Sequence, residues 1–450
     1  MNEATLNYVR QHADDDVSLL ALRGCKDPDV DLPYALQQIE GRQTARQKLP
    51  SWAALDAIQY PVHLSMEQCS SEATARYKAR LCRRLLQTSN FKLQTSNFKL
   101  QTSCVPSVAS DQRSSANFKL QTSNFKLQTS TLLDLTGGFG VDFIFMSEAF
   151  DEAVYVERND ALYQVASANI ALLCPHATTL CADGISVLQQ SGHATVIFLD
   201  PARRDDHGAR TYGIADCTPN VLDIRQTLLQ KADYVVLKLS PMLDWRKAVH
   251  DLGEQYVREV HIVSVANECK ELLLVLSAEG APLVLHCQND DQHFSPGKQE
   301  ELESLEKLEF LEPLEPLEKL EPLESLALPQ SATPYLYEPN ASIMKAGCFA
   351  QLAAHYGVAP IAPNSHLFLA PRLIADFPGR IFRITAVTTM NKRDLKRALG
   401  SLTQANIATR NFPLSVAELR RRLKLKDGGE TYIFATTQTD GTRILIVCRK

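Results

Sequence analysis

A glycine-rich turn, residues 136–140, directly follows the apolar segment Thr131–Leu135. Glycines let the backbone approach a ligand closely, and a turn of this kind leads into a helix N-terminus, where polar groups are bound. Asp134 precedes Gly138 and Gly140 by four and six residues, which differs from the spacing of dinucleotide-binding turns. The pattern suits a ligand that carries an ammonium group and no phosphate.

Three further acids follow the expected strands after this turn. Glu157 lies where a carboxylate can accept both hydroxyls of a ribose, and Asp183 lies where an acid can accept from an adenine amino group. Asp200 ends the fourth expected strand, at the crevice where a substrate would meet a cofactor. The alternative is that these acids only cap the helices that follow them.

Together these features resemble the motifs of class I methyltransferases, whose cofactor is S-adenosylmethionine. The resemblance predicts that the segment Leu132–Leu199 binds this cofactor. The expected cofactor-binding residues are Asp134, Thr136, Gly138, Gly140, Asp142, Glu157, Asp183 and Asp200.

The expected reactive end begins at Asp200-Pro201-Ala202-Arg203, which resembles the fourth motif of RNA uracil-C5 methyltransferases. Those enzymes also need a cysteine after the next strand, but residues 238–244 contain none. This argues against uracil-C5 chemistry, and we interpret Cys269, one strand further on, as a packed residue. If the acceptor is an amine, Asp200 and the Pro201 turn would orient it for in-line displacement, which needs alignment and loss of a proton.

Other polar residues near this end are catalytic or substrate-binding candidates. Arg203 and Arg204 could hold phosphate groups, or they could pair with the acids that follow them. Ser240 could contact substrate or could serve as a turn residue before Pro241. The predicted catalytic set is therefore Asp200, Pro201, Arg203 and Ser240.

A parallel α/β sheet is needed to position these residues. Residues 1 to about 84 have helical spacing, whereas short apolar runs alternate with helical patterns from Thr131 onward. The sequence predicts a doubly wound sheet that ends in an antiparallel pair. Its expected strands are Thr131–Leu135, Ala153–Val156, Thr178–Cys181, Val196–Asp200, Tyr234–Leu239, Val260–Val265, Lys270–Ser277 and Leu283–His286.

Two repeats interrupt this pattern. Asn-Phe-Lys-Leu-Gln-Thr-Ser recurs within residues 86–130, and its apolar residues alternate as in a strand. We interpret it as a flexible or weakly β-forming insertion. Leu-Glu-x recurs through residues 305–326 with three prolines, which favours disorder or a polyproline II helix.

The C-terminal part reads as a small α+β module. We expect a helix over Asn340–Tyr356, followed by strand Ile381–Thr388 and helix Lys392–Leu402. An Asp440-Gly441 turn between apolar runs predicts a hairpin near the end. The remaining expected elements are strand Asn406–Arg410, helix Ser415–Leu423 and strands Tyr432–Thr437 and Arg443–Cys448.

Charge is unevenly distributed along the chain. The formal net charge is −5, but residues 299–326 hold ten Glu against two Lys, and residues 391–450 hold 13 Lys and Arg against 5 Asp and Glu. A basic module of this kind favours a polyanionic partner. Phe412 beside these cations could add a stacking surface. The expected RNA-binding residues are Arg410, Arg420, Arg421, Arg422, Lys424 and Lys426; the alternative is a solvated helix face.

The remaining composition argues for a protein of the reduced cytoplasm. The 11 cysteines include no Cys-x-x-Cys pair, so we expect neither a disulfide framework nor a metal site. No apolar run reaches the roughly 18 residues of a membrane span, and acids lie where a signal peptide needs basic and apolar residues. We therefore expect no membrane partner.

The whole chain resembles bacterial class I methyltransferases that carry a C-terminal THUMP-like domain preceded by a small ferredoxin-like segment. The segments that carry the resemblance are Gln37–Gln43, Glu67–Glu72, Asp134–Asp142, Asp200–Arg204, Lys238–Asp244, Asn267–Glu271, Tyr337–Asn340, Phe377–Arg380, Arg410–Pro413 and Lys426–Gly429. The fold class implied is α/β, a Rossmann-like core with an N-terminal helical region and a C-terminal α+β module. The implied substrate is RNA, because THUMP domains bind tRNA-like acceptor ends.

These observations divide the chain into six expected parts. They are a helical region (1–85), the first repeat (86–130), a methyltransferase domain (131–297), the second repeat (298–328), a ferredoxin-like segment (329–379) and a THUMP-like basic module (380–450). The leading hypothesis is an S-adenosylmethionine-dependent methyltransferase of a base in tRNA or rRNA. The alternatives are a protein or small-molecule methyltransferase and a non-catalytic factor that binds S-adenosylmethionine and RNA.

Overall fold

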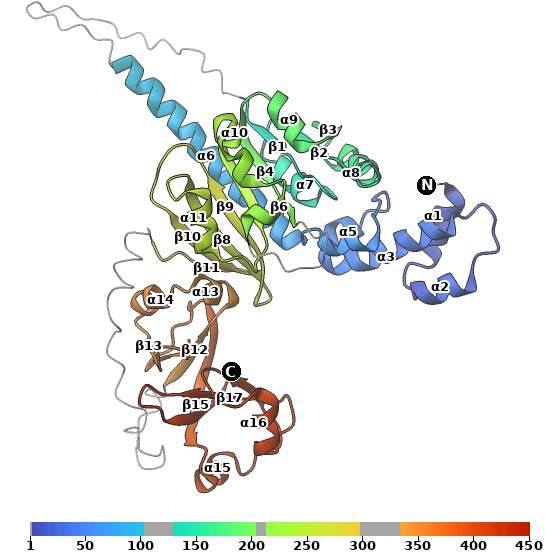
Figure 1. Ribbon diagram of the computed structural model, residues 1–450. Helices are drawn as coiled ribbons and strands as arrows, with labels where there is room; N and C mark the ends of the chain where they lie inside the picture. The colour runs from blue at the N-terminus through green and yellow to red at the C-terminus, as the bar shows by residue number, and fades with distance from the viewer. Residues whose placement is uncertain (1, 103–128, 204–212, 298–333) are drawn as a thin grey trace, which may run out of the picture. The chain divides into compact units, whose positions relative to one another are not determined.

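The computed structural model describes residues 2–102, 129–203, 213–297 and 334–450 (Figure 1). They form two compact units. Unit 1 comprises Met1–Val257 and Leu273–Gly280, and unit 2 comprises Arg258–Leu272 and Ala281–Lys450. No helix in the described part of the chain is both long enough and apolar enough to cross a membrane.

Unit 1 begins with helices, as the sequence predicts. They are α1 Glu3–Gln11, α2 Val17–Arg23, α3 Leu32–Lys48, α4 Pro50–Ala53, α5 His63–Gln68 and α6 Glu72–Thr102. Asp16 and Asp31 cap α2 and α3 by accepting from backbone N–H groups of the first turn. Val9, Leu20 and Ile39 pack together in a small core.

Helix α6 corrects one expectation. It continues to Thr102, so residues 86–102 of the first repeat are helical here and not β-forming. These residues contain neither Pro nor Gly, and adding residues to an existing helix costs far less than starting one. Leu86 and Ser89 are buried. Residues 103–128, which hold nearly all of the rest of the first repeat, and residues 298–333, which hold the whole second insertion, lie outside the described residues.

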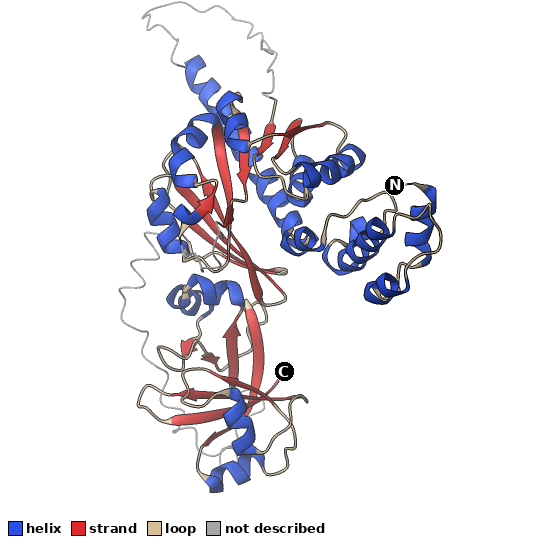
Figure 2. Cartoon of the chain, turned by 45° about the vertical axis from the view of Figure 1, so that its right-hand side comes forward, coloured by secondary structure: helices blue, strands red, loops and turns tan. Residues whose placement is uncertain are grey.

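A parallel sheet follows in unit 1, with strand order β7-β4-β1-β2-β3. The strands are β1 Thr131–Asp134, β2 Glu152–Glu157, β3 Ala177–Cys181, β4 Ala194–Leu199 and β7 Ala232–Leu239. Helices lie beside the sheet (Figure 2), namely α7 Val141–Ser147, α8 Asp160–Leu173, α9 Gly184–Gln190, α10 Val221–Lys231 and α11 Trp245–Leu252. The predicted Rossmann-like fold class is confirmed.

A two-stranded ribbon in unit 1 was not expected. It pairs β5 Ala202–Arg203 with β6 Cys217–Thr218 in antiparallel fashion, just after β4, and β6 follows a short helix, η1 Ile214–Asp216. Strand β9 Glu268–Leu276 has residues in both units.

Unit 2 contains a mixed group of strands. Strand β8 Val257–Val265 lies parallel to β10 Val284–Asn289, and β10 pairs with β11 Gln292–Phe294 in antiparallel fashion. The sequence predicts β8, β9 and β10 but not β11, which is only three residues long.

The rest of unit 2 is one seven-stranded sheet with the order β13-β14-β12-β15-β18-β17-β16. Its strands are β12 Tyr335–Pro339, β13 Ala359–Pro360, β14 Phe368–Ala370, β15 Gly379–Thr389, β16 Asn406–Thr409, β17 Thr431–Thr437 and β18 Arg443–Arg449. Strand β15 pairs with both β12 and β18. The sheet therefore joins the expected ferredoxin-like segment to the expected THUMP-like module.

The helices of this part are α13 Ala341–Ala346, α14 Phe349–Tyr356, α15 Lys392–Leu399 and α16 Val416–Leu423. The single helix expected over Asn340–Tyr356 is wrong, because Gly347 adopts a left-handed conformation and ends α13. Helix α16 begins at Val416, one residue after the predicted start, and Ser415 is its N-cap and forms a capping box with Glu418.

Candidate active site

The glycine-rich turn lies between β1 and α7 in unit 1. Gly138 and Gly140 have φ angles of +56° and +83°, a region that favours glycine. A Cβ on Gly137 would lie 2.0 Å from the ring of buried Tyr155, whose hydroxyl donates to the Gly138 carbonyl at 2.5 Å. The three glycines are therefore required by backbone conformation and by close packing.

Glu157 and Asp183 lie at or just after the ends of β2 and β3. Glu157 accepts from the Gly138 N–H at 2.9 Å and from the Asn159 N–H at 2.7 Å. Asp183 accepts from the Ser186 N–H at 2.9 Å and is the N-cap of α9. Helix capping, the alternative considered from the sequence, therefore occurs at Asp183, whereas Glu157 contacts the glycine-rich turn itself.

Asp134 is buried below the turn. Its side chain accepts from the Thr136 N–H at 3.0 Å, and its residue exposure is only 1%. Burial raises the pKa of this carboxyl well above its usual range, and the acids around it act in the same direction. Asp134 thus supports the turn from inside, and its predicted contact with a cofactor stays a prediction.

Thr136 connects the turn to the end of β4. Its hydroxyl oxygen accepts from the backbone N–H of Asp200 at 2.6 Å. The side chain of Asp200 is 40% exposed, and Pro201 after it is buried. The structure therefore brings the glycine-rich turn and the predicted catalytic aspartate together.

Asp142, in the first turn of α7, is held by three groups. Lys78 Nζ lies 3.1 Å from Oδ1, Lys238 Nζ lies 3.2 Å from Oδ2, and Ser70 Oγ donates to Oδ2 at 2.7 Å. Burial alone would raise the pKa of Asp142, but the two ammonium groups and the hydroxyl outweigh it, so this pKa is lowered. These contacts are all with other side chains of unit 1, so they do not test the predicted role of Asp142 in cofactor binding.

Lys238 is the residue that joins the two acids. Its Nζ lies 2.6 Å from Asp200 Oδ2, and it also donates to Ser70 Oγ at 3.0 Å. Lys78 is fully buried, and Ser70 and Lys78 both come from the N-terminal helical part of unit 1. Sequence reasoning missed Lys78, and it placed Ser70 and Lys238 only inside segments that carry the resemblance. Lys78 lies among several arginines of α6, and nothing in the sequence around it indicates that this one basic residue is buried.

The remaining catalytic candidates are only partly defined. Ser240 Oγ accepts from the Met242 N–H at 3.2 Å, as a turn residue would. Arg203 has its backbone in β5, paired with Cys217, and Arg204 lies outside the described residues. In unit 2, burial raises the pKa of the Cys269 thiol, as expected for a packed cysteine and not for a nucleophile.

The predicted RNA-binding residues fall into two groups. Arg410 pairs with Glu338 at 2.8 Å, and Arg420 pairs with Asp427 at 2.6 Å. Phe412 packs against a core cluster of unit 2, so the suggested stacking role is not supported by its position. The exposed members are Arg421, Arg422, Lys424 and Lys426.

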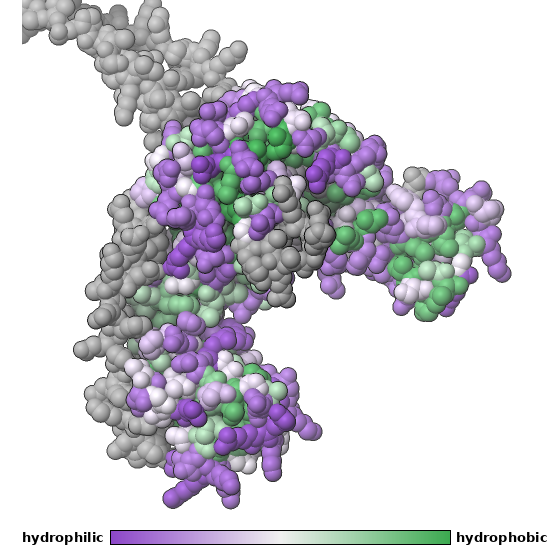
Figure 3. Space-filling view, in the orientation of Figure 1, coloured by the Kyte–Doolittle hydropathy of each residue, from purple (hydrophilic) through white to green (hydrophobic). Residues whose placement is uncertain are grey.

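Helix α15 adds basic side chains that sequence reasoning did not single out. Its exposed residues include Lys392, Arg393, Lys396 and Arg397. Figure 3 shows a largely hydrophilic surface where α15 and α16 lie. The helical spacing of Leu395 and Leu399, which pack against the core cluster, could have indicated this face. Basic residues between two leucines four apart lie on the opposite, exposed side of a helix.

Comparisons with known proteins agree with this architecture. Residues 335–378 match a family model described as a ferredoxin-like domain, and residues 379–450 match one described as THUMP domain-like. A search of curated proteins finds no significant match. A solved structure from Porphyromonas gingivalis W83, described as a "putative methyltransferase", is 29% identical and covers 99% of this chain and 97% of its own, with a TM-score of 0.76.

More distant structures match only about a third of the chain. A SAM dependent methyltransferase from Agrobacterium tumefaciens is 18% identical over 34% of this chain and 57% of its own, with a TM-score of 0.25. An rRNA methylase from Streptococcus thermophilus is 11% identical over 34% of this chain and 87% of its own, with a TM-score of 0.26. The full-length match shows that the chain shares its fold with a protein described as a putative methyltransferase, and the two family models identify a ferredoxin-like domain followed by a THUMP-like domain at its C-terminal end.

Proposed function

We propose that this chain transfers the methyl group of S-adenosylmethionine to a base of tRNA or rRNA. The observation that carries the proposal is the hydrogen bond from Asp200 N–H to Thr136 Oγ1. It joins the turn predicted to bind cofactor to the half-exposed carboxylate predicted to meet substrate. The full-length match to a protein described as a methyltransferase supports the same reading.

The residues around the turn fit the proposed cofactor. Glu157 has two oxygens with about four acceptor positions, of which the N–H groups of Gly138 and Asn159 use two. Acceptor capacity therefore remains for the two hydroxyls of a ribose. Asp183 is exposed beside the next strand end and keeps one oxygen, Oδ2, outside its cap to Ser186. We assign these two acids to the nucleoside part of the cofactor.

When bound, the cofactor supplies a methyl group on a positively charged sulfur. Asp200 accepts a hydrogen bond from an amine of the base and so aims the nitrogen lone pair at the methyl carbon. Asp200 would also take the proton that the amine nitrogen loses on methylation, or pass it to water. Lys238 keeps the carboxylate in one orientation by its 2.6 Å contact.

The first test separates cofactor binding from transfer. Asp200→Asn should bind S-adenosylmethionine, measured by titration calorimetry, but should lose about 100-fold or more in methyl transfer to total RNA from cells that lack this protein. Asp251→Asn is the matched control, since Asp251 also pairs with a lysine, Lys247, at 2.7 Å and lies on α11. Equal transfer by the Asp200→Asn variant and the wild type would refute the role of Asp200.

The second test addresses the acceptor. Exposed Arg421 and Arg422 on α16 support an RNA contact, because cations in the last turn of a helix can neutralise phosphates. Arg421→Glu/Arg422→Glu should weaken tRNA binding and make it less dependent on salt concentration. Arg443→Glu/Lys450→Glu is the control, because it makes the same change of charge elsewhere in the module. Transfer to a protein or small molecule, with no labelled RNA, would favour the alternative class of methyltransferase.

A further inference from the structure

A group of ionisable side chains lies on one face of the strands β8, β10 and β11 in unit 2. Glu259 and His261 are two residues apart on β8, so both side chains point to the same face. The strand register places His286 of β10 directly beside His261. His293 of β11 pairs with Gln288, which is two residues from His286 and therefore shares its face.

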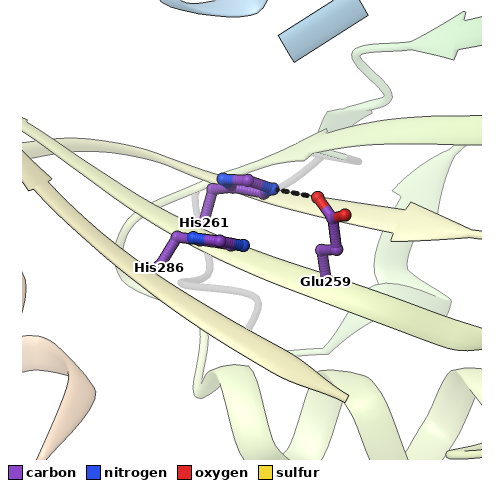
Figure 4. A group of neighbouring side chains, drawn as sticks. All are labelled: Glu259, His261 and His286. Carbon is purple, nitrogen blue, oxygen red and sulfur yellow. Dashed lines mark hydrogen bonds and ion pairs between the residues drawn. The ribbon is translucent and has the colours of Figure 1, made fainter. Parts of the chain in front are cut away.

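The three nearest of these groups converge. His261 Nε2 lies 2.8 Å from Glu259 Oε2, and the rings of His261 and His286 are stacked with centroids 4.5 Å apart. One ligand atom from each of Glu259, His261 and His286 lies within 4.8 Å of the other two. Figure 4 shows the two imidazoles side by side, with the Glu259 carboxylate at their common end. The His261 side chain is only 2% exposed.

A fourth residue orients this group from outside. His286 Nδ1 lies 3.3 Å from His293 Nε2, within hydrogen-bond distance. When His286 donates from Nδ1 to this partner, its Nε2 is left as the nitrogen with a lone pair. Metal-binding histidines are commonly fixed in this way by a hydrogen bond from their other ring nitrogen.

We propose that Glu259, His261 and His286 bind one divalent ion of the zinc class, with water completing the coordination. Two imidazoles and one carboxylate form a donor set that suits Zn²⁺. Ligand atoms about 2.0–2.1 Å from a tetrahedral zinc lie about 3.4 Å from one another. In this structure the three ligand atoms lie within 4.8 Å of one another. The stacked ring planes are 10° apart, so the two imidazoles must tilt away from the stack for both lone pairs to point at one ion.

The ion would join β8 to β10 within unit 2 and so stabilise that unit. The site consists of residues other than those of the proposed methyl-transfer site, so it does not depend on the proposed function.

The test uses the full-length purified chain, stripped with chelator and then dialysed against Zn²⁺. We expect about one tightly bound zinc per chain, measured by elemental analysis, and a melting temperature that rises with zinc concentration. Glu259→Gln and His286→Gln should each lose this zinc and the thermal shift. His250→Gln is the matched control, because the His250 side chain is 80% exposed on α11, and it should keep both.

A second measurement guards against zinc on cysteine, since the chain has 11 cysteines. Co²⁺ in place of Zn²⁺ should give the visible bands of a four- or five-coordinate ion with no thiolate charge-transfer band. A strong charge-transfer band, equal zinc content in Glu259→Gln and wild type, or no zinc on wild type would each overturn the proposal. This spectrum is recorded on the wild type, so it decides even if a variant fails to fold.

Discussion

Lys238 Nζ lies 2.6 Å from Asp200 Oδ2 and 3.2 Å from Asp142 Oδ2. One ammonium group from the end of β7 thus contacts the acid that follows β4 and the acid in the first turn of α7. Its side chain is 13% exposed, against 40% for Asp200. The lysine is therefore mostly shielded, while the carboxylate that it holds remains accessible to an acceptor.

Lys238→Met should lower methyl transfer strongly while leaving S-adenosylmethionine affinity unchanged. Without the ammonium group, Asp200 loses its fixed orientation, and positioned acid–base groups contribute about 10²–10⁴-fold. Single-turnover rates and calorimetry on the same variant check this. Lys247→Met, which breaks a pair whose lysine is 61% exposed, should change neither quantity. A parallel loss of cofactor affinity in Lys238→Met would assign the lysine to the cofactor site instead.

Lys78→Met should destabilise unit 1. Lys78 is fully buried and lies 3.1 Å from Asp142 Oδ1, and breaking a buried ion pair from one side typically costs about 3–5 kcal/mol. Arg83→Met on the same helix is the control, because the Arg83–Glu148 pair is about half exposed and should contribute at most about 1 kcal/mol. Urea unfolding compares the two variants. Similar losses would show that Lys78 acts through packing alone.

Asp134→Asn should stabilise the protein at neutral pH and have little effect in acid. Burial raises the pKa of Asp134 above the unfolded value of about 3.9. The folded chain therefore binds this proton more tightly, and its stability falls as pH rises from the unfolded pKa through the raised folded pKa. The amide keeps the acceptor for Thr136 N–H but carries no charge. Unfolding by urea at pH 4 and pH 7 measures the difference.

Asp151→Asn is the opposite case and serves as the control for that prediction. Hydrogen bonds from the backbone and hydroxyl of Ser130 lower the pKa of Asp151. Its contribution is present above the unfolded pKa and disappears as pH falls through the lowered one. This variant should therefore lose stability at neutral pH. The same sign of pH dependence in both variants would contradict the assignment for Asp134.

Gly137→Ala should damage the glycine-rich turn. The added Cβ would lie 2.0 Å from the ring of Tyr155, which is fully buried and cannot move aside. Overpacking of this kind typically costs about 1–3 kcal/mol. Gly192→Ala is the control, since nothing lies within 4 Å of the corresponding position and the change should stay within about 0.5 kcal/mol. Thermal melting and cofactor titration should both distinguish the two variants.

The sequence predicts the strand ends of the site well, because parallel strands place their last residues along one edge. Glu157 and Asp200 could be found from this rule alone. Lys78 could not, since it reaches Asp142 from a helix 64 residues earlier in the chain, and only tertiary packing makes that contact. The same limit applies to His261 and His286, which meet through strand register and have no metal-ligand spacing in the sequence.

The sequence predicts the wrong secondary structure where contacts with neighbouring elements override the preference of the local segment. The first repeat alternates like a strand, but its leading residues extend a helix that is already formed. Gly347 divides a segment whose apolar spacing favours one helix. Strands β13 and β14 are two and three residues long, too short for any periodic pattern.

The pairing of β12 with β15 has a practical meaning for anyone who divides this protein. Pro339 of the ferredoxin-like match lies opposite Gly379, where the THUMP-like match begins. Cutting the chain at that residue would open a backbone edge on both fragments, and such edges recruit other strands and promote aggregation. The smallest fragment that keeps this sheet whole is therefore 335–450. The two family matches thus describe two parts of one cooperative folding unit.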